Sequence, residues 1–281
     1  MPLSHLPDVH PTWLARSARI VGLRAGIAAL LEEESRMLLL EQPVLIAEYE
    51  ARLGMLDLEY LLIEAACSEL RFRIQQLHAL YNRGEVITPE RLAQLDAAVA
   101  EEQRIWTARL TQRENDLALG LAALRNMVLV DAAVQQRCRT AYRRLVRLLH
   151  PDVTLDPAAS QQFWQPVQAA YANLDADRLE ALLSVVQGEL DPVLEDALPQ
   201  GMEAIEQELS RLEAQVENLL RRQQELLVRS PFCYRALLHD AAALDALRAE
   251  RQQEIEQAKA RRDQLQSRLQ AYFEKQTVVL H

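Results

Sequence analysis

An all-α fold is predicted by three features of this sequence. Its 281 residues include only seven glycines and are rich in alanine, leucine, glutamine, glutamate and arginine, a composition that favours helices over tight hairpins. About half of the residues, 49%, are apolar, so the chain can bury a substantial core. Several segments repeat apolar residues at alternating spacings of three and four, as coiled-coil helices do. We therefore expect elongated helical hairpins or coiled coils.

Helix-breaking residues separate the first two expected helices. The first should span about 12–41, because a proline disfavours helical geometry in the residue before it and Pro43 follows. The second should span 44–82, with a C-cap and turn at Asn82, Arg83 and Gly84, since glycine tolerates the left-handed conformation that terminates helices. The heptad seam of this second helix comprises Ile46, Tyr49, Leu53, Leu56, Tyr60, Ile63, Cys67, Leu70, Ile74, Leu77 and Tyr81.

A third helix should begin at Thr88 and Pro89, which suit the cap and the first helical position. Because the connection is short, this helix should return antiparallel to the one before it. Its apolar residues are Leu92, Leu95, Val99, Trp106, Leu110, Leu117 and Leu124.

The C-terminal part should hold two further helices. Asp191-Pro192 and the segment 199–201 have the composition of a linker, and Ser230-Pro231 marks a second break. A helix from Met202 to about Leu226 carries a clear heptad seam, whereas the last, roughly 235–276, has a more mixed apolar stripe. We expect a C-terminal helical hairpin or coiled coil. The seams allow a homodimer without requiring one.

The central segment is basic within an acidic chain. The chain has a net charge of −10, but residues 120–150 contain six arginines against one acid. Asp131 is placed to cap a helix that begins at Ala132. The apolar residues that recur on one face of this helix are Cys138, Ala141, Leu145, Leu148 and Leu149.

Pro151 should end this central helix, because a proline cannot continue the helical hydrogen-bond ladder. His150, Pro151 and Asp152 should then lie at an exposed and rigidly placed corner. His150 and Asp152 could be read as a catalytic pair, but the intervening proline turns their side chains apart and no nucleophile is apparent nearby. We therefore expect a protein that is not an enzyme.

The sequence AYRRLVRLLHPD, residues 141–152, resembles helix II and the following tripeptide of J-domains, the DnaJ-like co-chaperone modules. Downstream, the positions that match helix III in spacing are Trp164, Val167, Ala170, Tyr171 and Leu174. The resemblance implies a central J-domain-like module, flanked by long coiled-coil helices, that docks on a DnaK-type ATPase and stimulates ATP hydrolysis. It also implies the partner-binding residues, which are Arg139, Tyr142, Arg143, Arg144 and Arg147 on a contact face and His150, Pro151 and Asp152 as the signal.

Three departures from the J-domain pattern leave a second interpretation open. The segment 121–131, where helix I should lie, offers only Leu124, Met127 and Leu129 for apolar contacts; Val153-Thr154 replaces a polar pair, and Pro166 should kink helix III or delay its start. The alternative function is a coiled-coil structural adaptor with a degenerate, non-stimulating J-like module. Under either interpretation, we expect three regions, 1–123, 124–190 and 191–281.

Composition also bounds location and partners. The cysteines Cys67, Cys138 and Cys233 are odd in number and outside metal-ligand spacing, so neither a disulfide framework nor a metal or other cofactor is expected. Neither a signal pattern nor a membrane-spanning run is evident, which favours a cytoplasmic protein without a membrane partner. The net negative charge disfavours nucleic acid. The client protein is not identified by the sequence.

Overall fold

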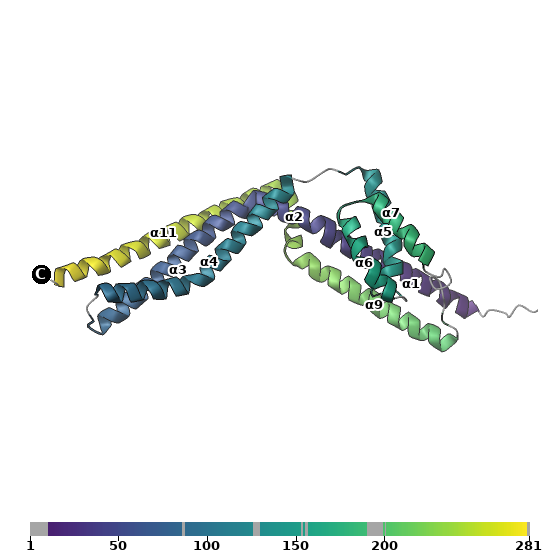
Figure 1. Ribbon diagram of the computed structural model, residues 1–281, viewed down its shortest axis with the longest axis horizontal. Coiled ribbons are helices and arrows are strands. Elements are labelled where there is room, and N and C mark those ends of the chain that lie inside the picture. Colours follow the sequence, from purple (N-terminus) through teal and green to yellow (C-terminus); the bar gives the residue numbers. More distant parts are fainter. Residues whose placement is uncertain are drawn as a thin grey trace, which may run out of the picture. The chain divides into compact units, whose positions relative to one another are not determined.

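The computed structural model describes residues 11–85, 88–125, 130–152, 154, 157–189, 199 and 201–279. Every regular element among these residues is a helix, which confirms the all-α class (Figure 1). The chain forms two compact units, one of residues 1–43 and 128–233 and the other of residues 44–127 and 234–281. This division differs from the three consecutive regions that we predicted, because N-terminal and C-terminal helices pair with each other in both units.

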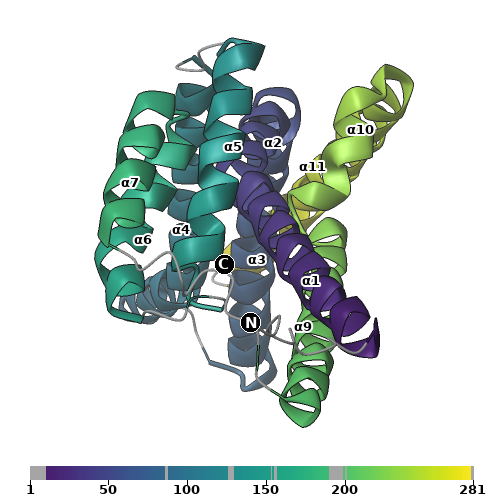
Figure 2. The same cartoon turned by 90° about the vertical axis from the view of Figure 1, so that its right-hand side faces the viewer.

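The first unit is built around its N-terminal helix. Its elements are α1 (Pro11–Arg36), the π-helical segment η1 (Met37–Glu41), α5 (Ala132–Leu149), α6 (Pro157–Ala172), α7 (Ala176–Glu189) and α9 (Met202–Val228). Helix α1 lies between α9 on one side and the group of α5, α6 and α7 on the other (Figure 2). The apolar core includes Ile20, Ile27 and Leu31 of α1, which pack with the buried residues of α5.

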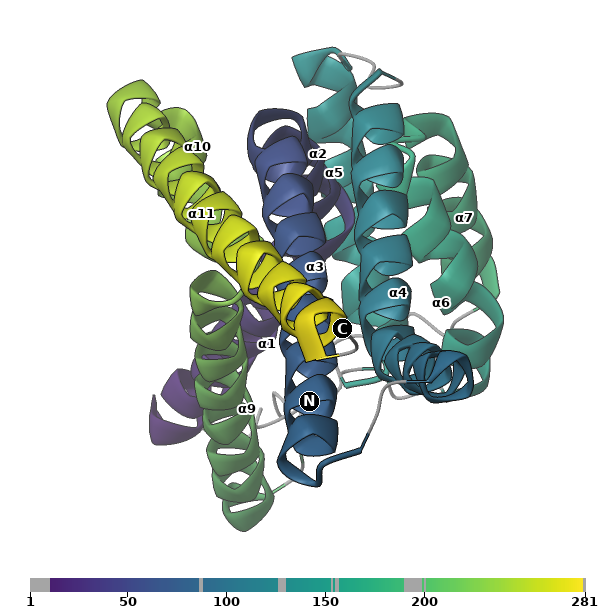
Figure 3. The ribbon, with the colours of Figure 1, turned by 90° about the vertical axis from the view of Figure 1, so that its left-hand side faces the viewer.

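The second unit is a bundle of long helices. Its elements are α2 (Gln42–Tyr49, which begins in the first unit), the π-helical segment η2 (Glu50–Gly54), α3 (Met55–Asn82), α4 (Pro89–Arg125), a short 3₁₀ turn η3 (Phe232–Tyr234, which begins in the first unit), α10 (Arg235–His239) and α11 (Ala241–Val279). Helix α3 packs against both α4 and α11 (Figure 3). The predicted seam is buried at Leu53 of η2 and at Ile63, Cys67, Ile74 and Leu77 of α3, whereas its first and last residues, Ile46 of α2 and Tyr81 of α3, are exposed.

Helices α3 and α4 form the predicted antiparallel hairpin. Near the turn, Arg73 Nη1 lies 2.7 Å from Asp96 Oδ1, and at the far end Arg113 Nη1 lies 2.7 Å from Glu50 Oε1. Paired residues of the two arms of the hairpin are therefore farther apart in the sequence when they lie farther from the turn, as expected for antiparallel helices.

The predicted C-terminal hairpin is replaced by two parallel pairings with N-terminal helices. In the first unit, hydrogen-bonded side chains of α1 and α9 are 184 to 193 positions apart. In the second unit, hydrogen bonds join residues of the segment 52–78 to residues of α10 and α11. The two residues of each bond are 186 to 197 positions apart. A nearly constant separation means that the paired helices run in the same direction. An apolar seam specifies which face of a helix is buried but not which helix covers it.

Pro43 does not end the first helix, so the predicted stop before it is wrong. Residues 37–41 form a π-helical turn, in which the Gln42 N–H bonds to the carbonyl of Met37, and α2 continues through Pro43. A π-helical turn is wider than an α-helical turn. Pro43 lacks a backbone N–H, and it lies where the hydrogen bonds change from the π-helical to the α-helical pattern. The helix therefore accommodates the proline ring at this position.

The linker segments fall partly outside the described residues. Asp191 and Pro192 are among the residues without a described position. Gly201 has a φ of 95° and precedes α9 as its N-cap, a conformation that a residue with a Cβ rarely adopts. The break around Ser230-Pro231 is confirmed, since α9 ends at Val228 and α10 begins at Arg235.

Candidate partner-binding site

Helix α5 begins as its sequence predicts. The Asp131 side chain accepts a hydrogen bond of 2.9 Å from the backbone N–H of Ala133, which satisfies one of the donors left open at a helix start. The helix then buries one face in the core of the first unit. Its fully or nearly buried residues are Cys138, Ala141, Tyr142, Leu145, Val146, Leu148 and Leu149.

The corner after α5 is a hydrogen-bonded turn. His150 leaves the helical conformation with φ of −63° and ψ of 130°, and Pro151 and Asp152 follow as an exposed turn. The Thr154 backbone N–H donates to the His150 carbonyl at 2.8 Å, and the Thr154 hydroxyl donates to the Leu148 carbonyl at 2.8 Å. The corner is therefore fixed to the end of α5. Val153 lies outside the described residues.

The imidazole of His150 is half-buried. Its ring lies edge-on to Trp164, with 4.9 Å between ring centroids. Its Nδ1 accepts a hydrogen bond of 3.1 Å from the Asp152 backbone N–H, so the ring proton belongs to Nε2. Burial and the nearby Arg222 guanidinium lower the pKa of His150, and the Asp152 carboxylate opposes them in part.

Helix α6 contains Pro166 and still begins early, at Pro157, so the expectation of a late start is wrong. Ala159 and Ser160 are buried before the proline, and Phe163 and Trp164 pack against the core. Tertiary packing thus holds the half of the helix where the proline interrupts the hydrogen-bond ladder. After the proline, Val167, Ala170 and Tyr171 are buried, as their spacing predicts.

The residues expected to pack as helix I are not all part of the first unit. Leu124 belongs to α4 in the second unit and is 38% exposed, while Met127 and Leu129 lie outside the described residues. Helix α1 packs against α5 instead. It does so because its apolar residues Ile20, Ile27, Ala28 and Leu31 join the core of the first unit.

Tyr142 is not part of an exposed contact face, and that prediction is corrected. Its side chain is fully buried and stacks on Tyr171, with 3.8 Å between centroids and 12° between ring planes. Burial, together with the neighbouring Glu32 carboxylate, raises the pKa of Tyr142 to about 12. An aromatic ring so placed stabilises the α5–α6 pair and is closed to a partner.

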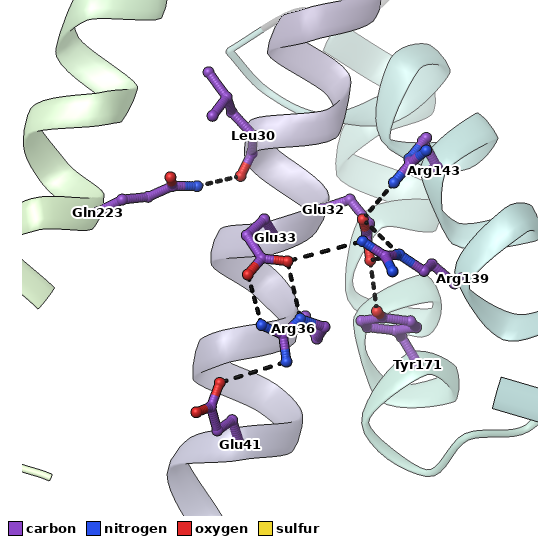
Figure 4. Close-up of polar contacts among 9 residues, drawn as sticks. All are labelled: Leu30, Glu32, Glu33, Arg36, Glu41, Arg139, Arg143, Tyr171 and Gln223. Atoms are coloured by element: carbon purple, nitrogen blue, oxygen red, sulfur yellow. Dashed lines mark hydrogen bonds and ion pairs between the residues drawn. The ribbon is translucent and has the colours of Figure 1, made fainter. Parts of the chain in front are cut away.

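Arg139 and Arg143, which are predicted contact residues, are engaged by an acidic residue of their own chain. Arg143 Nη2 lies 2.9 Å from Glu32 Oε2, and Arg139 Nε lies 3.1 Å from Glu32 Oε1 (Figure 4). The Tyr171 hydroxyl donates to the same carboxylate at 3.1 Å. The Glu32 side chain is fully buried, whereas the two arginines remain 45% and 44% exposed.

Glu32 was missed at the sequence level, although a signal for it is present. It is the first of three consecutive glutamates in α1. Successive helical residues point about 100° apart, so the three carboxylates face different neighbours. Glu32 contacts α5, Glu33 pairs chiefly with Arg36 of its own helix, and Glu34 pairs with Arg222 of α9.

The remaining arginines of α5 differ in their surroundings. Arg137 pairs with Asp177 and Glu180 of α7, at 2.7 and 2.6 Å. Arg144 is exposed and Arg147 is half-buried, and neither has an ion pair or hydrogen bond with a residue that the structure describes. Of the five predicted contact residues on α5, these two therefore remain open to a partner.

Helix α9 contacts the corner. Gln215 Nε2 donates to the Asp152 carbonyl at 2.8 Å, and Arg222 Nη1 lies 3.5 Å from Asp152 Oδ2. Arg222 also pairs with Glu34, at 2.6 Å. One guanidinium thus links α1, α9 and the corner.

Comparison with known proteins finds no matching family model, no matching curated protein and no matching solved structure. Within the described part of the chain, no group of three or more His, Cys, Asp or Glu residues is arranged to hold a metal ion. None of the helices described is both long and apolar enough to cross a bilayer.

Proposed function

We propose that the chain is a J-domain-like co-chaperone. In this proposal α5, the corner and α6 recruit a DnaK-type ATPase and stimulate its ATP hydrolysis, and the long helices scaffold or deliver a client. The catalytic step belongs to the partner, so the chain itself carries no reaction. The proposal places the protein in the cytoplasm with that partner.

The observation that carries this proposal is the corner at residues 150–152. It combines an imidazole held between Trp164 and a backbone N–H with the exposed Pro151 and Asp152. Immediately before it lie the open arginines Arg144 and Arg147. Cations in the last turns of a helix increase the rate of encounter with an acidic surface, and a rigid turn provides a fixed shape for recognition.

A single-turnover ATPase assay tests the proposal. The purified chain is added to DnaK loaded with ATP, and wild type is compared with His150→Gln. We expect wild type to accelerate hydrolysis and the variant to lose that effect. Raised salt should weaken the acceleration, because the attraction between exposed charges is screened within about 8–10 Å at ordinary ionic strength.

Arg144→Ala tests the contact assignment, with Arg178→Ala as its matched control. Arg178 is an exposed arginine on α7, in the same unit but off the basic helix. We expect the Arg144 variant to require more protein for half-maximal acceleration and the Arg178 variant to behave as wild type. Equal effects of the two would contradict a contact through α5.

The second candidate function is a coiled-coil adaptor with a J-like module that does not stimulate a chaperone. The engagement of Arg139 and Arg143 by Glu32 and the burial of Tyr142 favour it. No acceleration by wild type at any concentration would support the adaptor. Light scattering at several concentrations would then show whether the long helices also pair between chains.

A further inference from the structure

Helices α1 and α9 contact the two parts of the J-domain-like surface separately. From α1, the Glu32 carboxylate binds the guanidinium groups of Arg139 and Arg143. From α9, Gln215 and Arg222 bind the backbone and the side chain of Asp152. All of these contacts lie within the first unit.

Glu32 binds the arginines of α5 in the way that a carboxylate of an acidic partner protein would bind them. Arg139 and Arg143 are four residues apart, so they are neighbours on one face of α5, and both aim inward at a single acid. Arg147 continues the same face another turn on, without a described partner. A guanidinium that already holds Glu32 in a charge-assisted bond is not available to an external acid.

The contacts with the corner come from one face of α9. Gln215 and Arg222 are seven residues apart, which places them two turns apart on the same side of the helix. Helix α9 is itself held on α1 by further polar contacts, including a 2.8 Å hydrogen bond from Gln223 to the Leu30 carbonyl (Figure 4). The two helices therefore act on the module as one paired element.

We propose that Glu32 of α1, together with Gln215 and Arg222 of α9, forms an internal clamp that keeps Arg139, Arg143 and Asp152 engaged until an acidic partner surface displaces these polar contacts. This inference rests on the proposed function and adds a regulation to the same site. In the clamped state, Arg144 and Arg147 are open for encounter, while Arg139, Arg143 and Asp152 are engaged within the chain. Displacement of the clamp contacts frees the guanidinium groups of Arg139 and Arg143, which with Arg147 form a basic stripe for an acidic protein surface.

Loss of the clamp contact should shift the protein toward the open state, because a partner that binds only the open state competes with Glu32. Glu32→Gln keeps the size of the side chain and removes the charge that holds both arginines. We expect it to lower the concentration of protein needed for half-maximal acceleration of DnaK by about tenfold, within the usual range of coupling between two states.

Glu213→Gln is the matched control for this variant. It removes an ion pair between α1 and α9, the 2.5 Å contact with Arg19, without touching α5 or the corner. We expect it to behave as wild type. Hydrogen exchange of the free proteins should also be faster in α5 of the Glu32 variant than in wild type.

The double variant Glu32→Gln/His150→Gln separates release of the clamp from unfolding. An unfolded chain could stimulate DnaK as a client, whatever residue stands at position 150. We expect the double variant to be inactive. Acceleration that persists in it would overturn the clamp. If circular dichroism shows that Glu32→Gln has lost helicity, the same test is made with Arg222→Gln, which removes the ion pair between α9 and the Asp152 carboxylate.

The outcomes distinguish this inference from the function on which it rests. If wild type and Glu32→Gln accelerate hydrolysis equally and His150→Gln abolishes both effects, the co-chaperone function stands and the clamp is refuted. If neither protein accelerates hydrolysis, the proposed function fails and the clamp fails with it.

Discussion

Gly120 of α4 lies directly against the side chain of Glu50. A Cβ atom added at Gly120 would lie 2.5 Å from Glu50 Cγ and 2.7 Å from Glu50 Cβ, closer than the Cβ atoms of folded proteins approach non-bonded atoms. Glu50 is buried, and its Oε1 holds Arg113 at 2.7 Å. The absence of a side chain at Gly120 thus permits the close approach of α4 to the π-helical segment η2.

Gly120→Ala should destabilise the protein, although alanine is the better helix former. Overpacking of a tight contact costs about 1–3 kcal/mol, which exceeds the gain of about 1 kcal/mol from helix propensity. Gly26→Ala in α1 is the opposite case, since a Cβ there meets nothing within 4 Å and should stabilise the protein. Denaturant midpoints of the two variants check the signs. A stabilised Gly120→Ala would mean that α4 does not approach Glu50 closely.

Removal of the two arginines from Glu32 should cost more stability than removal of Glu32 itself. Arg139→Ala/Arg143→Ala leaves a fully buried carboxylate with Tyr171 alone, and an uncompensated buried charge costs about 3–5 kcal/mol. Glu32→Gln leaves two arginines that already reach solvent, so the loss should be nearer about 1–3 kcal/mol, the scale of charged hydrogen bonds. Chemical denaturation measures both free energies of unfolding. The reverse order would show that the carboxylate is not buried.

The lowered pKa of His150 should make stability depend on pH near neutrality. The folded state binds a proton there less readily than the unfolded chain, whose histidine has its ordinary pKa of 6.5. Stability contributed by the neutral ring is therefore complete above pH 6.5 and is lost as the pH falls through that value toward the lower folded pKa.

His150→Gln isolates this contribution, because every other titrating group is common to both proteins. Melting temperatures at pH 7.5 and pH 5 should differ more for wild type than for the variant. An identical loss in the two would mean that His150 titrates alike in the folded and unfolded chains.

Asp131→Ala should remove about 0.5–2 kcal/mol from the stability of the first unit, the usual effect of losing an N-cap. The cause is the loss of its hydrogen bond to the Ala133 N–H. Asp131→Ser retains an acceptor at the same place and should be close to wild type. Thermal melts followed by circular dichroism would compare the two. A loss of the same size in both would assign the effect to the charge of the aspartate instead of its bond.

Local features of the fold could be predicted from the sequence. The Asp131 cap, the end of α5 at Leu149 and the buried face of α5 each depend on residues within a few positions of one another. Sequence reasoning failed at Pro43, where a proline rule predicted that the helix would stop, and at Pro166 in one of its two alternatives, the late start of the helix. In the second case, burial of Ala159 and Ser160 outweighs the rule, which describes an isolated helix and takes no account of packing.

By itself, the sequence determined the all-α class, most of the faces that its helices bury, and the bounds of α5 between the Asp131 cap and Pro151. Only the tertiary structure decided that α9 lies parallel to α1, and that Glu32 meets Arg139 and Arg143 from 107 and 111 positions away. The physical reason is that periodicity records which side of a helix avoids water. The choice of partner depends on the fit of whole surfaces that are brought together only when the chain folds.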